Sequence, residues 1–210
     1  MDPAALRAAI QKDIALGAKP FFIVANGGTT NTGDVDDLTA LAAVAKEFGI
    51  WLHVDGAFGL FARLSPRTRP LTEGVERADS VTSDGHKWLN VPYDCGFAFL
   101  AEGDRLPRVF AYDAAYLAQD DEERPVFGVR GPEGSRRARA LAVWATLRAY
   151  GRTGHRALVE GHLELAQRLA RAVDDAPDLE RLADVPLNIV CFRYAPPDVD
   201  AADLDALNTR

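Results

Sequence analysis

The chain of 210 residues has little that would suit a membrane or a nucleic acid. No apolar run approaches the ~20 residues that a membrane-spanning helix needs. Its 24 basic residues are outnumbered by 31 acidic ones, and the net charge of −7 argues against nucleic acid or an anionic membrane as the main partner. The first residues lack the basic and apolar regions of a signal peptide. We therefore expect a globular, cytoplasmic protein that binds neither nucleic acid nor membrane.

Cysteine is also scarce. Cys95 and Cys191 lie far apart and do not have the spacing of metal ligands, which is typical of reduced, packed thiols in a cytoplasmic protein. His155 and His162 are seven residues apart in a predicted helix and make no convincing metal site. No metal is therefore expected.

The chain instead alternates short apolar runs with amphipathic segments. Asp2-Pro3 and Gly17 have the character of a helix start and end, and Asp36-Asp37 and Gly49 bound a second segment in the same way. Strands alternating with helices predict a mainly parallel α/β sheet, whose ligands lie beyond the carboxyl ends of the strands. The predicted strands are 20–25 and 50–54, both buried, followed by 78–82 and 95–101.

The pattern changes after about residue 103. Residues 113–134 predict a long irregular loop, of the kind that is often a lid or disordered. Arg136, Arg137 and Arg139 then crowd the start of a predicted helix, where the macrodipole disfavours cations. A solvated basic face would explain them, and so would a carboxylate or phosphate partner. The later predicted elements are helices over 135–150 and 155–173, a strand over 187–194 and a helix from 201.

Lys87 follows the third predicted strand and is one of only four lysines in the chain. A single lysine is by default a surface residue. The alternative is that its amine holds pyridoxal 5′-phosphate (PLP) covalently, since this cofactor needs a primary amine and a carboxylate that keeps its ring nitrogen protonated. The neighbouring residues His86 and Trp88 favour a lysine that belongs to a binding site over a lysine that is merely solvated.

Asp55 ends the second predicted strand and is followed by two small residues, Gly56 and Ala57. An aspartate in this place is commonly a turn cap. Its carboxylate can also pair with the pyridinium nitrogen of PLP, and Ala57 would leave room for the flat ring. Because Asp55 and Lys87 both follow the carboxyl ends of strands, the sequence predicts a PLP site at that edge of the sheet.

Two further segments are weaker candidates. His86 is either a packed histidine or a neighbour of the phosphate and the covalent link. Residues 27–33, rich in Gly and Thr, fit neither the Walker nor the dinucleotide pattern and by spacing alone form a polar turn. The turn follows a strand, however, which puts Thr30 near the same crevice.

Together these segments resemble the PLP-dependent group II amino-acid decarboxylases, the family of the aromatic-L-amino-acid and glutamate decarboxylases. The resemblance runs in order along nearly the whole chain. It implies fold type I, the aspartate-aminotransferase-like architecture, with 1–134 as the C-terminal part of the PLP-binding large domain and 135–210 as connecting helices and the beginning of a small domain. The motifs that carry it are G-T-T-N-T-G (28–33), W-L-H-V-D-G-A (51–57), A-D-S (78–80), D-G-H-K-W-L-N-V-P-Y-D-C-G (84–96), G-S-R-R-A-R-A-L-A-V-W (134–144) and, more weakly, L-N-I-V-C-F-R (187–193).

The resemblance also implies a homodimer with active sites between subunits and decarboxylation of a small amino-acid substrate. Its motif matches assign the cofactor contacts. Lys87 would carry PLP as an internal aldimine, Asp55 would pair with the ring nitrogen, Ala57 would lie beneath the ring, Thr30 would contact its substituents and His86 would lie near the phosphate.

Three departures from the family pattern define the alternatives. Family members are much longer, so the chain alone is expected to retain PLP poorly, and a non-catalytic truncated product is one alternative. The family's N-P-H-K is D-G-H-K here, which places Asp84 where an amide often contacts the phosphate. Residues 117–134 contain no tyrosine, the residue that protonates the reacting carbon in the family. An aldehyde synthase or an aminotransferase-like relative is therefore the other alternative.

Overall fold

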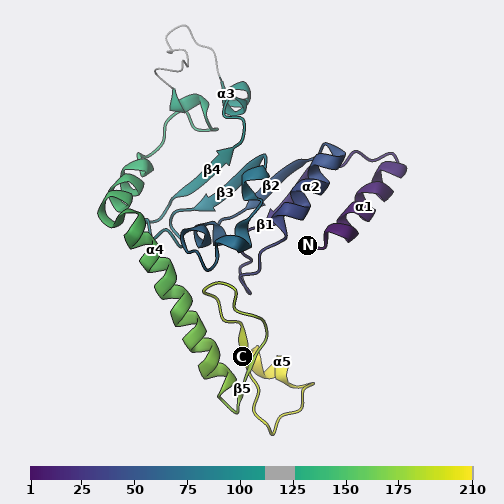
Figure 1. The fold of residues 1–210 in the computed structure, drawn as a ribbon, viewed down its shortest axis with the longest axis vertical. Coiled ribbons are helices and arrows are strands. Elements are labelled where there is room, and N and C mark those ends of the chain that lie inside the picture. The colour runs from purple at the N-terminus through teal and green to yellow at the C-terminus, as the bar shows by residue number, and fades with distance from the viewer. Residues whose placement is uncertain (112–125, 210) are drawn as a thin grey trace.

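The computed structural model describes residues 1–111 and 126–209 (Figure 1). Within them, four strands form one sheet in the order β1-β2-β3-β4. The first three strands are parallel and β4 runs antiparallel to β3, which confirms the predicted mainly parallel sheet. The strands are β1 (Phe22–Asn26), β2 (Trp51–Asp55), β3 (Ser80–Asp84) and β4 (Gly96–Leu100).

A capped helix precedes each of the first two strands, as the sequence predicted. Asp2 accepts hydrogen bonds from the N–H groups at the start of α1 (Pro3–Ala15). Asp37 caps α2 (Leu38–Phe48) in the same way, and Gly49 ends it with a φ of 65°, a left-handed conformation that favours glycine. Figure 1 shows α2 lying across β1 and β2, with α1 beyond it.

The sheet has one covered face and one open face. Alternate residues of β1 and β2 point to the covered face, where Ile23, Ala25, Leu52 and Val54 are buried with the apolar side of α2. The other alternate residues, which include Val24, lie on the open face and are half-buried or exposed. The main hydrophobic core therefore fills the space between α2 and one side of the sheet.

The long helix α4 (Arg139–Asp174) corresponds to both helices predicted over 135–150 and 155–173. The two meet without a loop at Gly151, whose φ of 59° and ψ of −176° break the helical path. The helix begins four residues later than predicted. It runs from beside β4 to a second, two-stranded sheet (Figure 1).

The second sheet corrects one prediction. A strand was expected over 187–194, but only the last three of these residues form one, and Leu187 lies outside it in a fully buried position. Leu187 packs with Val159 and Leu163 of α4 and with Ala62 and Trp88 of the first part of the chain. The elements here are β5 (Leu179–Arg181), β6 (Phe192–Tyr194) and α5 (Leu204–Asn208).

Several short elements were not anticipated by the sequence analysis. They are α3 (Arg105–Phe110) and the 3-10 helices η1 (Gly59–Leu64), η2 (Arg69–Thr72), η3 (Val75–Arg77) and η4 (Phe127–Val129). Most of the predicted loop over 113–134 lies outside the described residues.

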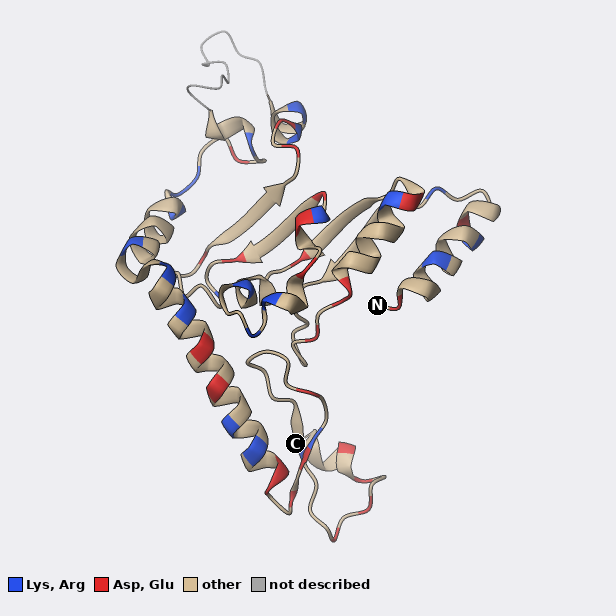
Figure 2. Cartoon of the chain, viewed as in Figure 1, with Lys and Arg blue, Asp and Glu red and all other residues tan. Residues whose placement is uncertain are grey.

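Charge is distributed unevenly over these elements. Charged side chains are spread along α4, whereas the four strands of the main sheet are almost uncharged (Figure 2). Asp55 and Asp84 are the only Asp, Glu, Lys or Arg residues in these strands, and each is the last residue of its strand. Both carboxylates are thus placed at the carboxyl edge, where α/β sheets bind ligands.

Candidate cofactor-binding site

The strand register places the two carboxylates on the same face and at the same edge. Asp55 of β2 pairs with Thr82 of β3, and Asp84 follows Thr82 by two residues. Because side chains alternate along a strand, Asp55, Thr82 and Asp84 all lie on the open face. The prediction that Asp55 ends its strand is confirmed.

The turn after β2 brings Ala57 between the two strand ends. The Ala57 N–H donates to Asp55 Oδ1 at 3.0 Å, and the Ala57 carbonyl accepts from the Asp84 N–H at 3.1 Å. Asp55 is exposed, and its second oxygen, Oδ2, makes no hydrogen bond to another described residue. One carboxylate oxygen therefore remains available to a ligand beside a small side chain.

Lys87 lies in the turn that follows β3. Its Nζ is 2.9 Å from Asp84 Oδ2, and its side chain is 43% exposed. The neighbouring Trp88 is buried, donates from Nε1 to His162 Nδ1 at 3.1 Å, and stacks on Phe58 with ring centroids 5.5 Å apart. The tryptophan anchors the turn that carries the partly exposed lysine.

His86 is held from two directions. Its Nδ1 lies 2.7 Å from the carbonyl oxygen and 3.0 Å from the amide nitrogen of Cys95. Its Nε2 is 3.6 Å from Asp84 Oδ2, and its ring lies 4.1 Å from that of the exposed Tyr93, measured between centroids. His86 is thus a packed side chain that also lies beside the Lys87–Asp84 pair.

Thr30 lies in the polar turn after β1. This turn approaches the next strand closely, because the Gly27 N–H donates to the Asp55 carbonyl at 2.7 Å and a side chain on Gly27 would press on that oxygen. Thr29 organises the turn through Thr32, at 2.8 Å between the hydroxyls. Thr30 itself is exposed and makes no hydrogen bond to another described residue.

Sequence reasoning missed two features of this site. One is the Asp84–Lys87 ion pair, whose signal was the D-x-x-K spacing across a turn. The other is the role of His162 as the partner of Trp88, which joins residues 74 apart and has no local signal.

Other features of the structure lie away from this edge. His53 is held by Ser80 at 2.8 Å and Thr82 at 3.3 Å on the open face. A cavity of about 760 Å³ opens at the amino ends of β2 and β3, beside Trp51 and Asp79. Within the described ranges no cluster of His, Cys, Asp or Glu is arranged to hold a metal ion, and no helix there has the length and apolarity to cross a membrane.

The donor set at this edge fits PLP. The cofactor requires an accessible primary amine and a carboxylate for its ring nitrogen. Lys87 and Asp55 supply these groups from adjacent strand ends, and the small side chain of Ala57 leaves room beside Asp55 for a flat ring.

Comparison with known proteins agrees with this chemistry. A family model described as the pyridoxal-dependent decarboxylase conserved domain matches residues 1–195. The chain belongs to the pyridoxal-dependent decarboxylase family. Its cofactor is PLP, and its fold is that of the fold type I enzymes.

Relatives and solved structures give the extent of the similarity. The chain is 37% identical over 202 residues to an aromatic-L-amino-acid decarboxylase of Bacillus atrophaeus, covering 95% of this chain and 42% of that protein. It is 33% identical over 198 residues to a phenylacetaldehyde synthase of Arabidopsis thaliana, covering 92% and 40%. The crystal structure of the Oryza sativa enzyme TDC with PLP and tryptamine superimposes with a TM-score of 0.93 at 29% identity, covering all of this chain and 44% of that one. The chain therefore spans less than half the length of these relatives.

Proposed function

We propose that the protein carrying these residues is a PLP-dependent carboxy-lyase that removes the α-carboxylate of an L-amino acid. The observation that carries the proposal is the placement of Lys87 and Asp55 at adjacent strand ends in a chain of this family. When bound, PLP supplies an electron sink for the pair of electrons left on the α-carbon as carbon dioxide departs.

Each residue of this edge has a role in the proposal. Lys87 would hold the cofactor covalently through Nζ. Asp55 would keep a proton on the ring nitrogen through Oδ2, while the Ala57 N–H donates to Oδ1. The side chain of Ala57 bounds the space for the ring. His86 would lie near the phosphate, and Thr30 would contact the ring substituents.

The experiment that tests the proposal maps the covalent attachment. The longest natural chain that contains these 210 residues is loaded with PLP, reduced with borohydride, digested and analysed by mass spectrometry. We expect the pyridoxyl group on Lys87 and none on Lys12, Lys19 or Lys46. The control is Lys87→Arg, which keeps a cation beside Asp84 but cannot form the bond. A pyridoxyl group on another lysine would contradict the proposal.

A second candidate function is an aldehyde-forming synthase. It is favoured by the relative named phenylacetaldehyde synthase and by the absence of tyrosine from 117–134. Such a reaction consumes dioxygen and water, forms an aldehyde, carbon dioxide and ammonia, and reduces the dioxygen to hydrogen peroxide. Product analysis separates the two functions, because the carboxy-lyase gives an amine without consuming dioxygen. A transaminated product would indicate the aminotransferase-like alternative, and no product from the longest chain would indicate a non-catalytic remnant.

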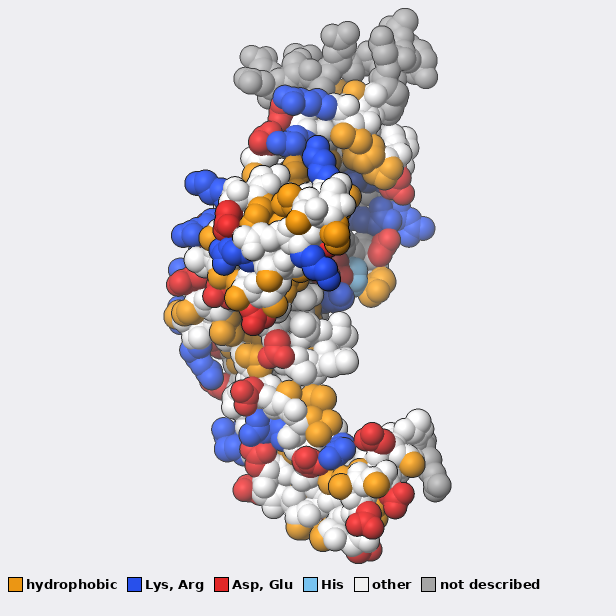
Figure 3. All heavy atoms as spheres, turned by 90° about the vertical axis from the view of Figure 1, so that its right-hand side faces the viewer, with side chains coloured by type: hydrophobic (Ala, Val, Ile, Leu, Met, Phe, Trp, Pro, Cys, Tyr) orange, Lys and Arg blue, Asp and Glu red, His pale blue; other side chains and the backbone are white. Residues whose placement is uncertain are grey.

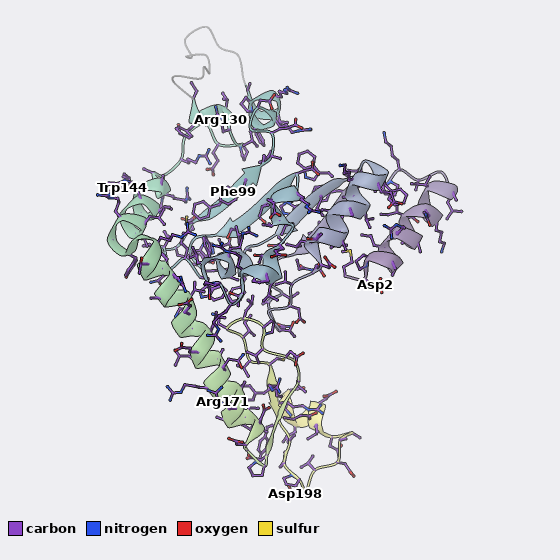
Figure 4. All side chains as sticks on the ribbon, viewed as in Figure 1. Asp2, Phe99, Arg130, Trp144, Arg171 and Asp198 are labelled. Atoms are coloured by element: carbon purple, nitrogen blue, oxygen red, sulfur yellow. The ribbon has the colours of Figure 1, made fainter. Side chains whose placement is uncertain are left out.

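The proposal includes the organisation of the protein. We propose a large-domain part over 1–134 and a second part over 135–210, supported by the main sheet in the first and the β5–β6 sheet in the second. A homodimer is supported by exposed apolar side chains near the amino end of α4, among them Trp144, which Figure 4 labels (64% exposed). A cytoplasmic location is supported by the two cysteines, both of which are free.

A further inference from the structure

Asp84, on the open face of the sheet, carries a half-buried carboxylate that has no role in the proposed function. A single oxygen, Oδ2, lies 2.9 Å from Lys87 Nζ and 3.6 Å from His86 Nε2. Its side chain is 25% exposed, against 43% for Lys87. The amine that would receive the cofactor is therefore already paired with a less exposed carboxylate.

The position of this carboxylate is fixed by its surroundings. Asp84 is the last residue of β3, and its N–H donates to the Ala57 carbonyl at 3.1 Å. Its own carbonyl accepts from the Lys87 N–H at 3.4 Å, so the turn and the ion pair join the same two residues. The facing His86 is held by the backbone of Cys95. Asp84 is thus a fixed partner for the more exposed side chain of Lys87.

We propose that Asp84 is a positioning residue that holds the Lys87 amine until the cofactor is captured, and that breaking this ion pair limits the rate of capture. The part of the proposal that names PLP rests on the proposed function. In the capture step Lys87 Nζ gives a proton to solvent and forms a bond to the aldehyde carbon of PLP, and the aldehyde oxygen leaves as water. The amine cannot attack while its proton is shared with Asp84 Oδ2.

The first test uses no cofactor. The longest natural chain is treated briefly with dilute acetic anhydride, and the acetylation of each lysine is quantified by mass spectrometry. We expect Asp84→Asn to increase the labelling of Lys87 about twofold to fivefold relative to Lys12, Lys19 and Lys46, the range that corresponds to a partly exposed ion pair. Asp84→Glu should keep the slower labelling. An unchanged labelling ratio in Asp84→Asn would overturn the proposal.

Varying the salt concentration tests the Asp84–Lys87 ion pair in the unmodified protein. Screening weakens a partly exposed ion pair, so Lys87 labelling in the unmodified protein should rise with ionic strength more than that of the other three lysines. In Asp84→Asn this extra rise should be absent. If the labelling of all four lysines depended equally on salt, the proposed role of the ion pair would be contradicted, even if the variants failed to fold.

The second test follows PLP capture by the absorbance of the bound cofactor in a stopped-flow experiment. Asp84→Asn should capture PLP about twofold to fivefold faster, and the matched control Asp94→Asn, whose carboxylate pairs with Arg139 instead, should leave the rate unchanged. Equal rates in all three proteins, with PLP on Lys87, would overturn the role of Asp84 and leave the proposed function intact. PLP on another lysine would refute the proposed function, while the labelling ratio would still report on the ion pair.

Discussion

The two faces of the main sheet differ in what they bury and in what they carry. On the covered face Val54 is 1% exposed, whereas on the open face of the neighbouring strand Val24 is 44% exposed. Parallel sheets are ordinarily covered on both faces. The open face here also bears both strand carboxylates, Asp55 and Asp84. The covered face thus determines the fold, and the open face carries the polar groups of the proposed site.

Other parts of the surface are also apolar. Figure 3 shows hydrophobic side chains among charged ones on the side that it views, and Phe99 of β4, labelled in Figure 4, is 50% exposed. Exposed apolar patches of this kind mark surfaces that other protein segments cover. The comparison of faces is therefore best tested with pairs of variants, one from each face.

The largest effect is expected on the open face, at Asp55. Asp55→Asn keeps the size of the side chain but removes the charge that would hold the ring nitrogen protonated. We expect turnover to fall by about a hundredfold or more, the size typical of removing one electrostatic group from a catalytic site. Attachment of PLP to Lys87 should persist, as measured by absorbance. Asp104→Asn, an exposed carboxylate paired with Arg108, serves as the control. Unchanged turnover in Asp55→Asn would remove this residue from its proposed role.

The second prediction compares the same substitution on the two faces. Val54→Ala should lower the free energy of unfolding by about 1.5–3 kcal/mol, because it removes two buried methyl groups from the core beneath α2 and leaves a cavity there. Val24→Ala should cost less than half as much, since much of that side chain remains in water. Urea denaturation of both variants measures the difference. Equal losses would mean that the open face is covered in solution.

The sequence predicted the elements whose signals are local. The strand that ends at Asp55 is a short apolar run, and the caps at Asp2 and Asp37 follow from side chains that bond the nearest N–H groups. Parallel pairing then places the strand ends at one edge, so that the candidate site could be inferred before any contact was known. The expected roles of Lys87, Asp55, Ala57, His86 and Thr30 toward PLP remain predictions.

The features that the sequence did not predict depend on distant contacts. The apolar run at 187–191 resembles a strand, yet Leu187 is buried because it fills space beside the glycines of the turn after β1. Apolar runs alone do not distinguish a strand from a buried loop. The Asp84–Lys87 pair depends on the turn between them, which the sequence left open.

The two cysteines allow buried and exposed positions to be compared by chemical modification. Cys95 is 4% exposed, and burial raises the pKa of its thiol, whereas Cys191 is partly exposed. Because the thiolate is the reactive form, we expect a maleimide to modify Cys95 about tenfold or more slowly than Cys191. Peptide mapping at short reaction times gives the two rates, and in urea they should converge. Faster modification of Cys95 in the folded protein would contradict its burial.

The smallest effect is expected at the start of α4, where the sequence left two explanations for three arginines. Arg139 donates from Nε and Nη2 to the two oxygens of Asp94, each at 2.9 Å, so a carboxylate partner accounts for this arginine. The hydrogen bond from Arg139 lowers the pKa of Asp94 from 3.8 to about 2. A carboxyl group whose pKa is lowered on folding stabilises the protein above its ordinary pKa and loses this contribution as pH falls toward the lowered value.

Arg139→Gln should therefore lower the urea midpoint slightly and by a constant amount above about pH 5, since exposed ion pairs contribute little. The difference from the unmodified protein should narrow between pH 4 and pH 2, as Asp94 becomes protonated in both. Arg137→Gln is the matched control: Arg137 lowers the pKa of Asp94 only through its charge, a smaller contribution than the hydrogen bond from Arg139, so this variant should show a much smaller narrowing. A difference that persists unchanged at pH 2 would mean that Arg139 stabilises the start of α4 through its packing and not through the Asp94 carboxylate.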